Sequence, residues 1–427
     1  MAAAAGGAEP ALKVALVSRT DIQGGAARAS YRLHRALQAS GHSSRMWVGV
    51  KRSSDPTVLG PEGPLARGWS RVRPGLANAL MRLQGARDAN LRSPAIFPSG
   101  LARSINRSDA EVVNLHWIGE ETLSVAETAR LRKPVVWTLH DMWPFCGAEH
   151  YAPDGADARW RAGYESAAQN SALRGLDLDR WVWKRKKKAW RARRLIAPSR
   201  WLAQCARGSA LMRDWPVTVV PNVIDTEQFR PSQDSRIREA LGLPATKRLL
   251  LFSAVSGTAD PRKGWDLLVA ALQPLASANR DLECLVLGQD APGRPADFPL
   301  PVRWMGEIRD DTLLAGLYST SAVAVVPSRQ DNLPLVATEA QACGCPVAAF
   351  AAGGLPDAVE HGATGYLAQP FDAAELAKGI GWILADRERH LQLREQSRER
   401  AVRLWSAAAV VPRYLEVFAA AAAPAAR

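Results

Sequence analysis

Short apolar runs alternate with longer mixed segments through both halves of the chain, and this alternation restricts the fold more than any other feature. In the first half the runs are Leu12–Ser18, Arg45–Val50, Glu111–Trp117, Pro134–His140, Leu195–Arg200 and Val217–Asn222. In the second half they are Lys247–Ser253, Leu282–Gly288, Val302–Gly306, Ala322–Pro327 and Pro346–Phe350. Continuous apolar runs of this length are typical of parallel strands that are covered on both faces. We therefore predict an α/β fold in which helices connect parallel strands.

The length of the chain predicts two such units. At 427 residues it exceeds what one hydrophobic core usually holds, and a break falls near residues 226–246. We expect two doubly wound, Rossmann-like domains, 1–228 and 229–400, with a cleft between them. Residues 401–427 should form a C-terminal helix, apolar on one side from Trp405 to about Phe418, that returns to the first domain. The Ala/Gly-rich first ten residues and the Ala-rich end are expected to be disordered.

The cysteine pattern and the N-terminal sequence indicate a cytoplasmic protein. The five cysteines are odd in number and include no C-x-x-C pair, which argues against a disulfide framework or a structural zinc site. The start of the chain lacks the charged and apolar parts of a signal peptide, and no apolar run is long enough to cross a bilayer.

The net charge of +13 is concentrated in one segment. Arg180–Arg194 holds nine basic residues and no acidic one, with Trp183 and Trp190 seven residues apart. This pattern fits either a surface helix that packs its tryptophans inward or a peripheral contact with an anionic membrane. No nucleic-acid-binding module accompanies it, so we expect no nucleic-acid partner.

The clearest candidate site follows the run Ala322–Pro327. Asp331 and Glu339 stand eight residues apart, and Pro334 suits the first turn of a helix that runs to about Cys343. If the whole interval were helical, the two carboxylates would be separated by about 12 Å and about 80°. The free N–H groups of such a helix start favour a phosphate ligand, and Gly353-Gly354 should bring further N–H groups to the anion. The alternative for Asp331 is a helix N-cap.

Other candidates also follow predicted strands, at the edge where α/β sheets bind ligands. Gly24-Gly25 opens a helix after the first strand, and His140 ends another strand. Arg262 and Lys263 precede Gly264 at the start of a helix in the second half. Two carboxylates also suit acid/base hydrolysis, but Lys263 and the helix start favour a diphosphate.

The order of these motifs resembles the retaining glycosyltransferases of family four, which have the GT-B fold, over residues 12–418. Members carry E-x7-E before a Gly-Gly-hydrophobic-Pro-Glu loop, which matches Asp331, Glu339 and Gly353–Asp357. Other matches, in chain order, are Gly24-Gly25, Leu139-His140-Asp141, Ala197–Arg200, Val220–Asn222 with Asp225, Arg262–Gly264 and Ala342–Pro346. Trp137–Phe145 and Gln330–Pro334 are closest to the colanic-acid-type enzymes that build bacterial exopolysaccharides. Departures are Asp331 in place of Glu, Val223 in place of Gly, no arginine within 254–258 and no cysteine within 147–178.

The resemblance implies transfer of a sugar from a nucleotide-sugar donor to a glycan or lipid-linked hydroxyl, with retained configuration and without a metal ion or other cofactor. It assigns His140, Asp331, Arg262 and Lys263 to the reacting sugar and diphosphate. It assigns Glu339 to the ribose, Gly24 and Gly25 to the approach of donor and acceptor, and Asn332 and Leu335 to the substrate. The turn at Glu307-Ile308 is expected to contact the base. The first domain would then be the acceptor side and the second would bind the nucleotide sugar.

Three alternatives stay open at this point. A nucleotide-sugar epimerase would release a modified sugar without an acceptor, and a glycan phosphorylase would need inorganic phosphate. The third is a basic protein that keeps the fold but binds without catalysis. Working at the inner face of the cytoplasmic membrane would suit a lipid-linked acceptor.

Overall fold

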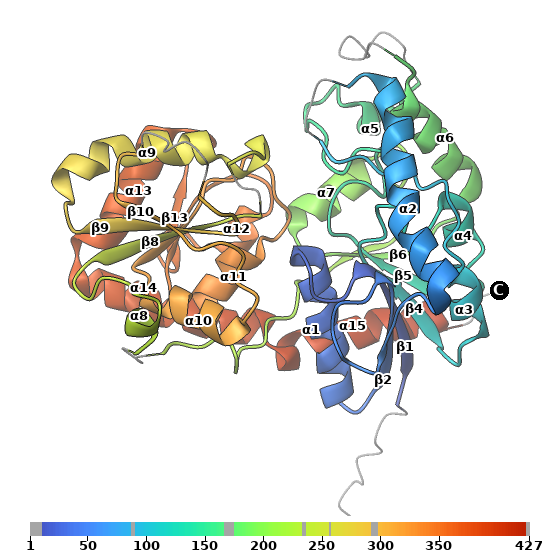
Figure 1. Ribbon diagram of the computed structural model, residues 1–427, viewed down its shortest axis with the longest axis horizontal. Coiled ribbons are helices and arrows are strands. Elements are labelled where there is room, and N and C mark those ends of the chain that lie inside the picture. Colours follow the sequence, from blue (N-terminus) through green and yellow to red (C-terminus); the bar gives the residue numbers. More distant parts are fainter. Residues whose placement is uncertain are drawn as a thin grey trace, which may run out of the picture.

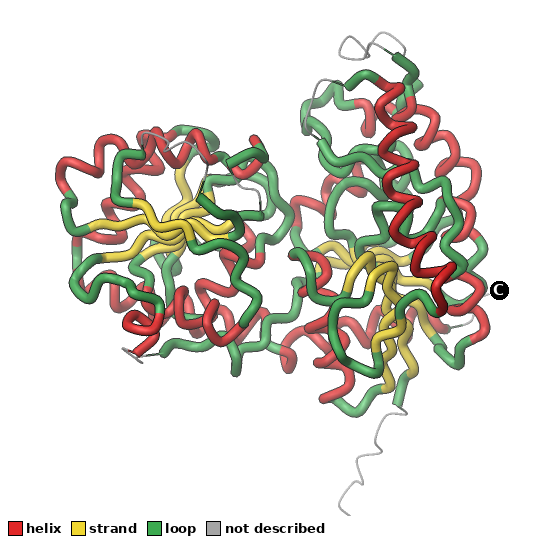
Figure 2. Tube along the Cα trace, viewed as in Figure 1, coloured by secondary structure: helices red, strands yellow, loops and turns green. Residues whose placement is uncertain are grey.

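Two parallel sheets form the centres of two domains, which lie side by side (Figure 1). The computed structural model describes residues 11–86, 90–165, 175–232, 236–255, 258–291 and 298–423. The predicted GT-B class is confirmed, because each domain holds one sheet with helices on both faces. Figure 2 shows both sheets in yellow with red helices around them. The expected disorder of residues 1–10 lies outside the described residues.

The strand orders of the two sheets are equivalent. The first sheet contains β1 (Lys13–Thr20), β2 (Ser43–Val50), β3 (Val58–Leu59), β4 (Val112–Leu115), β5 (Val135–Thr138), β6 (Arg194–Ala197) and β7 (Val217–Val219), in the order β3-β2-β1-β4-β5-β6-β7. The second contains β8 (Arg248–Ser253), β9 (Leu282–Leu287), β10 (Val302–Trp304), β11 (Val323–Val326), β12 (Val347–Phe350) and β13 (Gly365–Ala368), in the order β10-β9-β8-β11-β12-β13. The order reverses between β1 and β4 and between β8 and β11. Ligands of doubly wound sheets bind beyond the carboxyl ends of the strands at such switch points.

Helices cover both faces of each sheet. In the first domain they are α1 (Gly25–Ala39), α2 (Gly63–Met81), α3 (Leu101–Arg107), α4 (Val125–Ala129), α5 (Arg159–Ala162), α6 (Leu178–Ala189) and α7 (Arg200–Gly208), with the 3₁₀ turn η1 (Arg82–Gln84) after α2. The others are α8 (Arg236–Ala240), α9 (Trp265–Ala278), α10 (Asp311–Thr320), α11 (Leu335–Ala342), α12 (Leu355–Ala358), α13 (Ala373–Ala385), α14 (Arg387–Trp405) and α15 (Ala407–Ala422), with η3 (Pro261–Lys263) before α9. None of the described helices combines the length and the apolar character that a bilayer-crossing helix needs.

Side chains cap many of these helices but not two that begin at the switch points. Ser124, Ser199, Asp310, Asp386 and Ser406 accept backbone N–H bonds at the starts of α4, α7, α10, α14 and α15. In contrast, α1 and α11 begin without a side-chain cap and without an acidic residue in the first turn. Their N-terminal N–H groups and the positive ends of their dipoles therefore favour an anion.

The chain crosses between the domains twice, and the two crossings touch. The backbone N–H of Ile224 donates to the Trp405 carbonyl over 2.8 Å, next to the break between α14 and α15. Beyond that break, Val410, Tyr414 and Phe418 of α15 pack with Val14 and other residues of the first sheet. Figure 1 shows α15, in red, beside the blue helix α1. The C-terminal helix therefore belongs to the core of the first domain.

Two boundary predictions were wrong. In the basic segment, helix α6 ends at Ala189 rather than continuing to Arg194, and residues 194–197 join the first sheet. The Ala-rich end is helical as far as Ala422, because α15 continues to pack on the first domain as far as Ala421; residues 424–427 lie outside the described residues.

The stability of the first domain should depend on pH through His34. This buried side chain lies 2.8 Å from both Ser44 Oγ and Thr57 Oγ1, and burial lowers its pKa to about 4. Since unfolded histidine titrates near 6.5, the unfolded chain binds this proton more tightly, and stability should fall as the pH drops from 6.5 toward 4. Between pH 7 and 5 the loss should be about 2 kcal/mol for this group.

Urea unfolding of His34→Gln measures that contribution. The variant keeps a hydrogen-bonding side chain without the titration, so its free energy of unfolding should change less between pH 7 and 5 than that of the wild type. His361→Gln, at an exposed position, is the matched control. An equal pH dependence in wild type and His34→Gln would contradict the assignment.

Candidate active site

A cavity of about 1070 Å³ lies between the carboxyl ends of the two sheets. Its wall includes all ten of the residues predicted for the site: Gly24, Gly25, His140, Arg262, Lys263, Ile308, Asp331, Asn332, Leu335 and Glu339. Residues from both domains therefore face one space, which we call the cleft. Its volume is at the upper end of the range of small-molecule sites.

Two uncapped helix starts face each other across the cleft. Gly24, with φ 91°, is the residue before α1, and Pro334 is the residue before α11. A Cβ added at Gly25 would lie 4.0 Å from the Leu335 side chain, so the two helix starts are in close approach. Both present unbonded N–H groups and positive dipole ends to the same space, which is a favourable environment for phosphate.

Asp331 lies in the loop before α11, where it pairs with Lys263. The Lys263 ammonium donates to Asp331 Oδ2 over 2.6 Å, and the Asn332 backbone N–H donates to Oδ1 over 2.9 Å. Because Pro334 is the residue before the helix, Asp331 is not its N-cap, and that alternative was wrong. The helix spans only Leu335–Ala342, so the estimate of 12 Å and 80° for a fully helical interval does not apply.

Arg262 and Lys263 are held at the cleft by a glycine turn. Gly264 has φ 69°, and a Cβ there would overlap the Pro327 carbonyl oxygen at the end of β11. The turn therefore packs directly on the strand that leads to Asp331. The Arg262 guanidinium donates to Asp260 over 2.6 Å and lies 4.1 Å from the ring centre of Tyr151 in the first domain.

Glu339 is almost completely buried in an ion pair between the domains. Its Oε1 lies 2.7 Å from a guanidinium nitrogen of Arg32 on α1, and Tyr318 donates to Oε2 over 3.0 Å. The exposed fractions of the Arg32 and Glu339 side chains are 8% and 3%. Burial acts to lower the pKa of Arg32, but the charge of Glu339 and that of Asp311 outweigh it and raise the pKa. Arg32 therefore stays charged across the neutral range.

Asn332 joins the two domains through its side-chain amide. Its Oδ1 accepts a bond from Ser199 Oγ at 2.7 Å, and its Nδ2 donates to the carbonyls of Leu139 at 3.3 Å and His140 at 3.4 Å. Gly354 fits directly beneath, since a Cβ there would overlap the Asn332 carbonyl oxygen. The Gly354 N–H donates to the Asp331 carbonyl over 2.9 Å, so this N–H holds the loop of Asp331 rather than an anion, and the expectation for Gly354 was wrong.

His140, which is partly buried, and the buried His116 are two neutral histidines whose rings touch. His140 Nε2 lies 2.9 Å from His116 Nδ1. Burial lowers the pKa of His140 to about 4 and that of His116 well below its usual value. Neither ring is charged at neutral pH, so His140 can offer its second nitrogen, Nδ1, to a ligand as a neutral hydrogen-bonding group.

Each of the two domains matches a different family of known sequences. Residues 23–228 match the sequence family described as "Glycosyltransferase Family 4", and residues 233–400 match "Glycosyl transferases group 1". The chain belongs to family 4 of the glycosyltransferases. An enzyme is therefore supported over the non-catalytic alternative.

Individual relatives of this family 4 glycosyltransferase match it either over only part of the chain or at low sequence identity. D-inositol 3-phosphate glycosyltransferase from Thermobispora bispora is 33% identical over 218 residues, 47% of this chain and 50% of that protein. The chain thus spans about half the length of the curated relatives it matches. Sucrose-phosphate synthase from Thermosynechococcus elongatus has a similar fold, with 24% identity and a TM-score of 0.65 over 96% of this chain and 100% of that one. HepE from Anabaena, solved with UDP and glucose, has 15% identity and a TM-score of 0.62 over 96% of this chain and 99% of that one.

Sequence reasoning missed several residues of the glycosyltransferase cleft. Arg28 and Arg32, one turn apart on α1, both pair with Asp311 of the second domain. Tyr151 and Tyr318 also line the cleft. Two cations at i and i+4 directly after Gly24-Gly25 were a usable signal, because they share the helix face that follows the glycine turn. The tyrosines carry no such signal in the sequence.

The basic segment packs two of its three tryptophans inward. Trp183 and Trp190 are buried in the first domain, and Lys186 is fully buried with its ammonium 3.8 Å from the ring centre of Trp143. Lys184, Lys187 and Lys188 remain exposed. The structure therefore has the packing expected of a surface helix, while its outer face stays strongly cationic.

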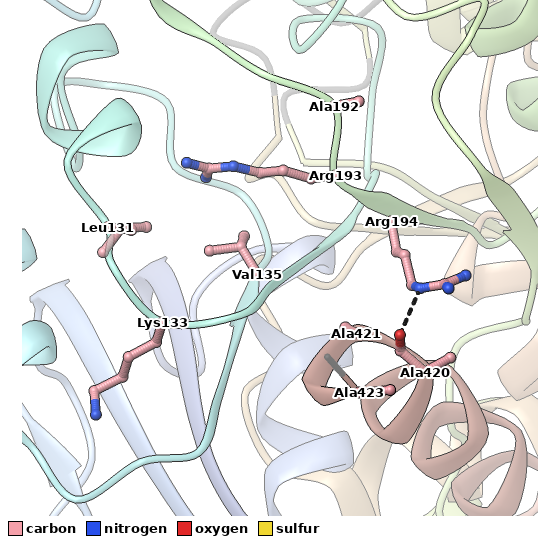
Figure 3. Close-up of a pocket in the computed structure, with 9 residues that line it drawn as sticks. All are labelled: Leu131, Lys133, Val135, Ala192, Arg193, Arg194, Ala420, Ala421 and Ala423. Atoms are coloured by element: carbon pink, nitrogen blue, oxygen red, sulfur yellow. Dashed lines mark hydrogen bonds between the residues drawn. The ribbon is translucent and has the colours of Figure 1, made fainter. Parts of the chain in front are cut away.

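A second cavity, of about 350 Å³, lies away from the cleft (Figure 3). It is formed where the end of α15 meets β5 and β6, and Arg194 Nε donates to the Ala420 carbonyl over 3.0 Å at its edge. Among the described residues, its wall has cationic and alanine side chains but no carboxylate. Within the described residues, no three His, Cys, Asp or Glu side chains are grouped so as to hold a metal ion.

A double-mutant cycle should reveal strong coupling between Arg32 and Glu339. Each of Arg32→Met and Glu339→Gln should lower the free energy of unfolding by about 3 kcal/mol. The first leaves the buried Glu339 without its cation, and the second leaves Arg32 only its 3.4 Å contact with Asp311. The double variant should lose at least about 1.5 kcal/mol less than the sum of the two single losses. Urea unfolding at pH 7 measures all four proteins.

The exposed pair Arg309 and Glu307 is the matched control. Its side chains are 80% and 44% exposed, so its coupling should stay below about 1 kcal/mol. Additive losses at Arg32 and Glu339 would mean that the two charges do not interact as the 2.7 Å contact indicates.

Proposed function

We propose that the chain transfers a sugar, with retained anomeric configuration, from a nucleotide-sugar donor to a hydroxyl of a glycan or lipid-linked acceptor in bacterial polysaccharide or glycolipid synthesis. The observation that carries this proposal is the meeting of the α1 and α11 starts beside Lys263 and Arg262 in one cleft. Uncapped helix starts and cations together suit the diphosphate of such a donor.

The ribose and base would lie against the second domain. A carboxylate has about four acceptor positions, and Arg32 and Tyr318 use only two of those on Glu339. The remaining positions can accept bonds from two ribose hydroxyls. Ile308, partly buried against the core of the second domain, offers an apolar surface and neighbouring backbone for the base. The UDP bound to HepE makes UDP the first nucleotide to test.

The chemistry requires that charge on the leaving diphosphate be stabilised as the glycosidic bond breaks. Lys263 has three N–H donors, of which Asp331 accepts one at 2.6 Å. The other two, the Arg262 guanidinium and the helix starts are fixed before reaction, so little reorganisation accompanies the charge change. A neutral His140 can hydrogen-bond the donor sugar without repelling positive charge that develops at the anomeric carbon.

A peripheral membrane contact suits a lipid-linked acceptor. We propose that the exposed lysines of α6, Lys184, Lys187 and Lys188, face an anionic surface, with the protein acting at the inner face of the cytoplasmic membrane. Each cation near such a surface contributes about 1 kcal/mol. The burial of Trp183 and Trp190 assigns the contact by α6 to its charge rather than to these two rings.

Removal of the Lys263 charge should slow the chemical step. Lys263→Ala should reduce kcat about 10²–10³-fold, with a smaller effect on KM for the donor, because the charge matters most when the diphosphate leaves. Lys378→Ala, at an exposed position on α13, is the control. An unchanged kcat in Lys263→Ala would contradict the role.

Product analysis separates the transferase from its alternatives. With a radiolabelled UDP-sugar and a membrane-lipid extract, the product should carry the sugar in the donor's anomeric configuration by NMR. A modified free sugar formed without acceptor would indicate an epimerase, and dependence on inorganic phosphate would indicate a phosphorylase.

Calorimetry with UDP and GDP, in wild type and Glu339→Gln, should show that loss of the carboxylate weakens binding at least about tenfold.

A further inference from the structure

Helix α2 exposes an apolar stripe to solvent. Leu65, Trp69, Val72 and Leu76 follow one another at intervals of four, three and four residues, which places them along one side of the helix. Leu83 in η1 continues the series. We call these five residues the α2 face. Their exposed fractions run from 37% for Trp69 to 89% for Leu65.

The opposite side of α2 faces the domain and is made of different residues. Ser70, Arg73, Ala77 and Met81 are buried, at the same helical spacing. The usual arrangement, with large apolar residues inward and polar residues outward, is therefore reversed over most of this helix. Exposing three leucines, a valine and a tryptophan costs solubility, and contiguous apolar patches of this kind mark interaction sites.

The α2 face is continuous with the outer side of α6. The Leu176 N–H donates to the Leu83 carbonyl over 3.1 Å, and Leu176 is itself 61% exposed. Met81 packs with Leu178 and Val182 of α6, and both figures show the two helices side by side on the outside of the first domain (Figure 1, Figure 2). Trp181, the exposed tryptophan of α6, is 41% accessible.

Charge identifies the partner that this surface suits. Arg67, Arg71 and Arg82 are exposed beside the α2 face, and α2 contains no acidic residue. On α6 the exposed lysines 184, 187 and 188 add three more cations, of which Lys187 pairs with the exposed Glu165 at 3.2 Å, whereas Asp179 is buried. An apolar strip flanked by cations matches the apolar interior and anionic headgroups of a bilayer. A symmetric contact with a second copy would instead bring the same cations together.

We propose that the α2 face inserts into the headgroup region of an anionic bilayer, with the exposed cations of α2 and α6 on the lipid phosphates. Leu91, eight residues beyond Leu83, lines the cleft, so one edge of the cleft is connected closely in sequence to this surface. Delivery of a lipid-linked acceptor along that edge rests on the proposed sugar transfer, whereas binding of the bilayer does not depend on that transfer.

Vesicle flotation tests the contact without any sugar transfer. The full chain should bind vesicles of phosphatidylglycerol and phosphatidylcholine, and bind pure phosphatidylcholine at least tenfold more weakly. Leu65→Ser with Leu76→Ser should weaken binding to the anionic vesicles about tenfold or more, since less apolar area is buried. Leu391→Ser with Val402→Ser, on the exposed side of α14, should bind like the wild type.

A second variant measures the charge. Lys184→Gln with Lys188→Gln should weaken binding by roughly 25-fold, about fivefold per lysine, and 0.5 M salt should abolish the difference. Equal binding by the wild type and the α2 variant would overturn the role of the α2 face. So would light scattering that shows a dimer in the wild type and a monomer in the α2 variant, since the occupant would then be a second copy.

Calorimetry with UDP in the absence of vesicles separates this proposal from the proposed function. Wild type and all three surface variants should bind UDP equally, because none of the changed residues lines the cleft. Absence of UDP binding in every protein would count against the proposed donor. A surface variant that loses vesicle binding but still binds UDP would bear only on the membrane proposal and not on the proposed function.

Discussion

The amide of Asn332 is the contact on which the arrangement of the cleft depends. It is buried where the second domain meets the ends of two strands of the first, and it bonds to Ser199, Leu139 and His140. Ser199 also caps α7, so the same hydroxyl fixes a helix and a domain contact. A buried amide that satisfies both its oxygen and its nitrogen in this way tolerates little displacement, because a lost bond would leave a polar group unpaired. The positions of Asp331 and His140 follow from it.

The charged side chains of the cleft form ion pairs around two helix starts that have no capping side chain. Lys263 is bonded to Asp331, Arg262 to Asp260, Arg32 to Glu339 and Arg28 to Asp311. Such pairing offsets the cost of holding charge in a partly buried space. The starts of α1 and α11 have neither a side-chain cap nor an acidic residue in the first turn, so they mark where an anion is favoured. Two of the pairs also join the domains, so the same side chains line the cleft and hold the two domains together.

The wall of the cleft on the first domain is supported from behind by a buried lysine. Lys186 donates to the carbonyls of Trp143, Cys146 and Gly147, and burial lowers its pKa to about 7. Three carbonyls around one ammonium hold the loop that carries Asp141 and His150, whose side chains are themselves bonded over 2.6 Å. The basic segment therefore has two roles, with Lys186 inward as a support and its other lysines outward.

The alternation of apolar runs and the length of the chain were sufficient to predict two doubly wound domains. The motifs after the strands, with the family resemblance that they carry, identified ten residues of the cleft. This succeeded because parallel strands buried on both faces need long apolar runs, and because their carboxyl ends meet at one edge. The two-residue strand β3 and the glycine-led β13 were missed, since neither has a run long enough to show a period.

Only the tertiary structure decided which partner each of these residues has. Asp331 and Glu339 have equal prominence in the sequence, yet one pairs with Lys263 of its own domain and the other with Arg32 across the cleft. The exposed side of α2 was likewise undetermined, because a helical pattern of apolar residues indicates a face but not whether the protein or the solvent lies against it. Local spacing determines the elements and their faces, whereas packing between elements distant in sequence determines which charges meet and which apolar surfaces stay open.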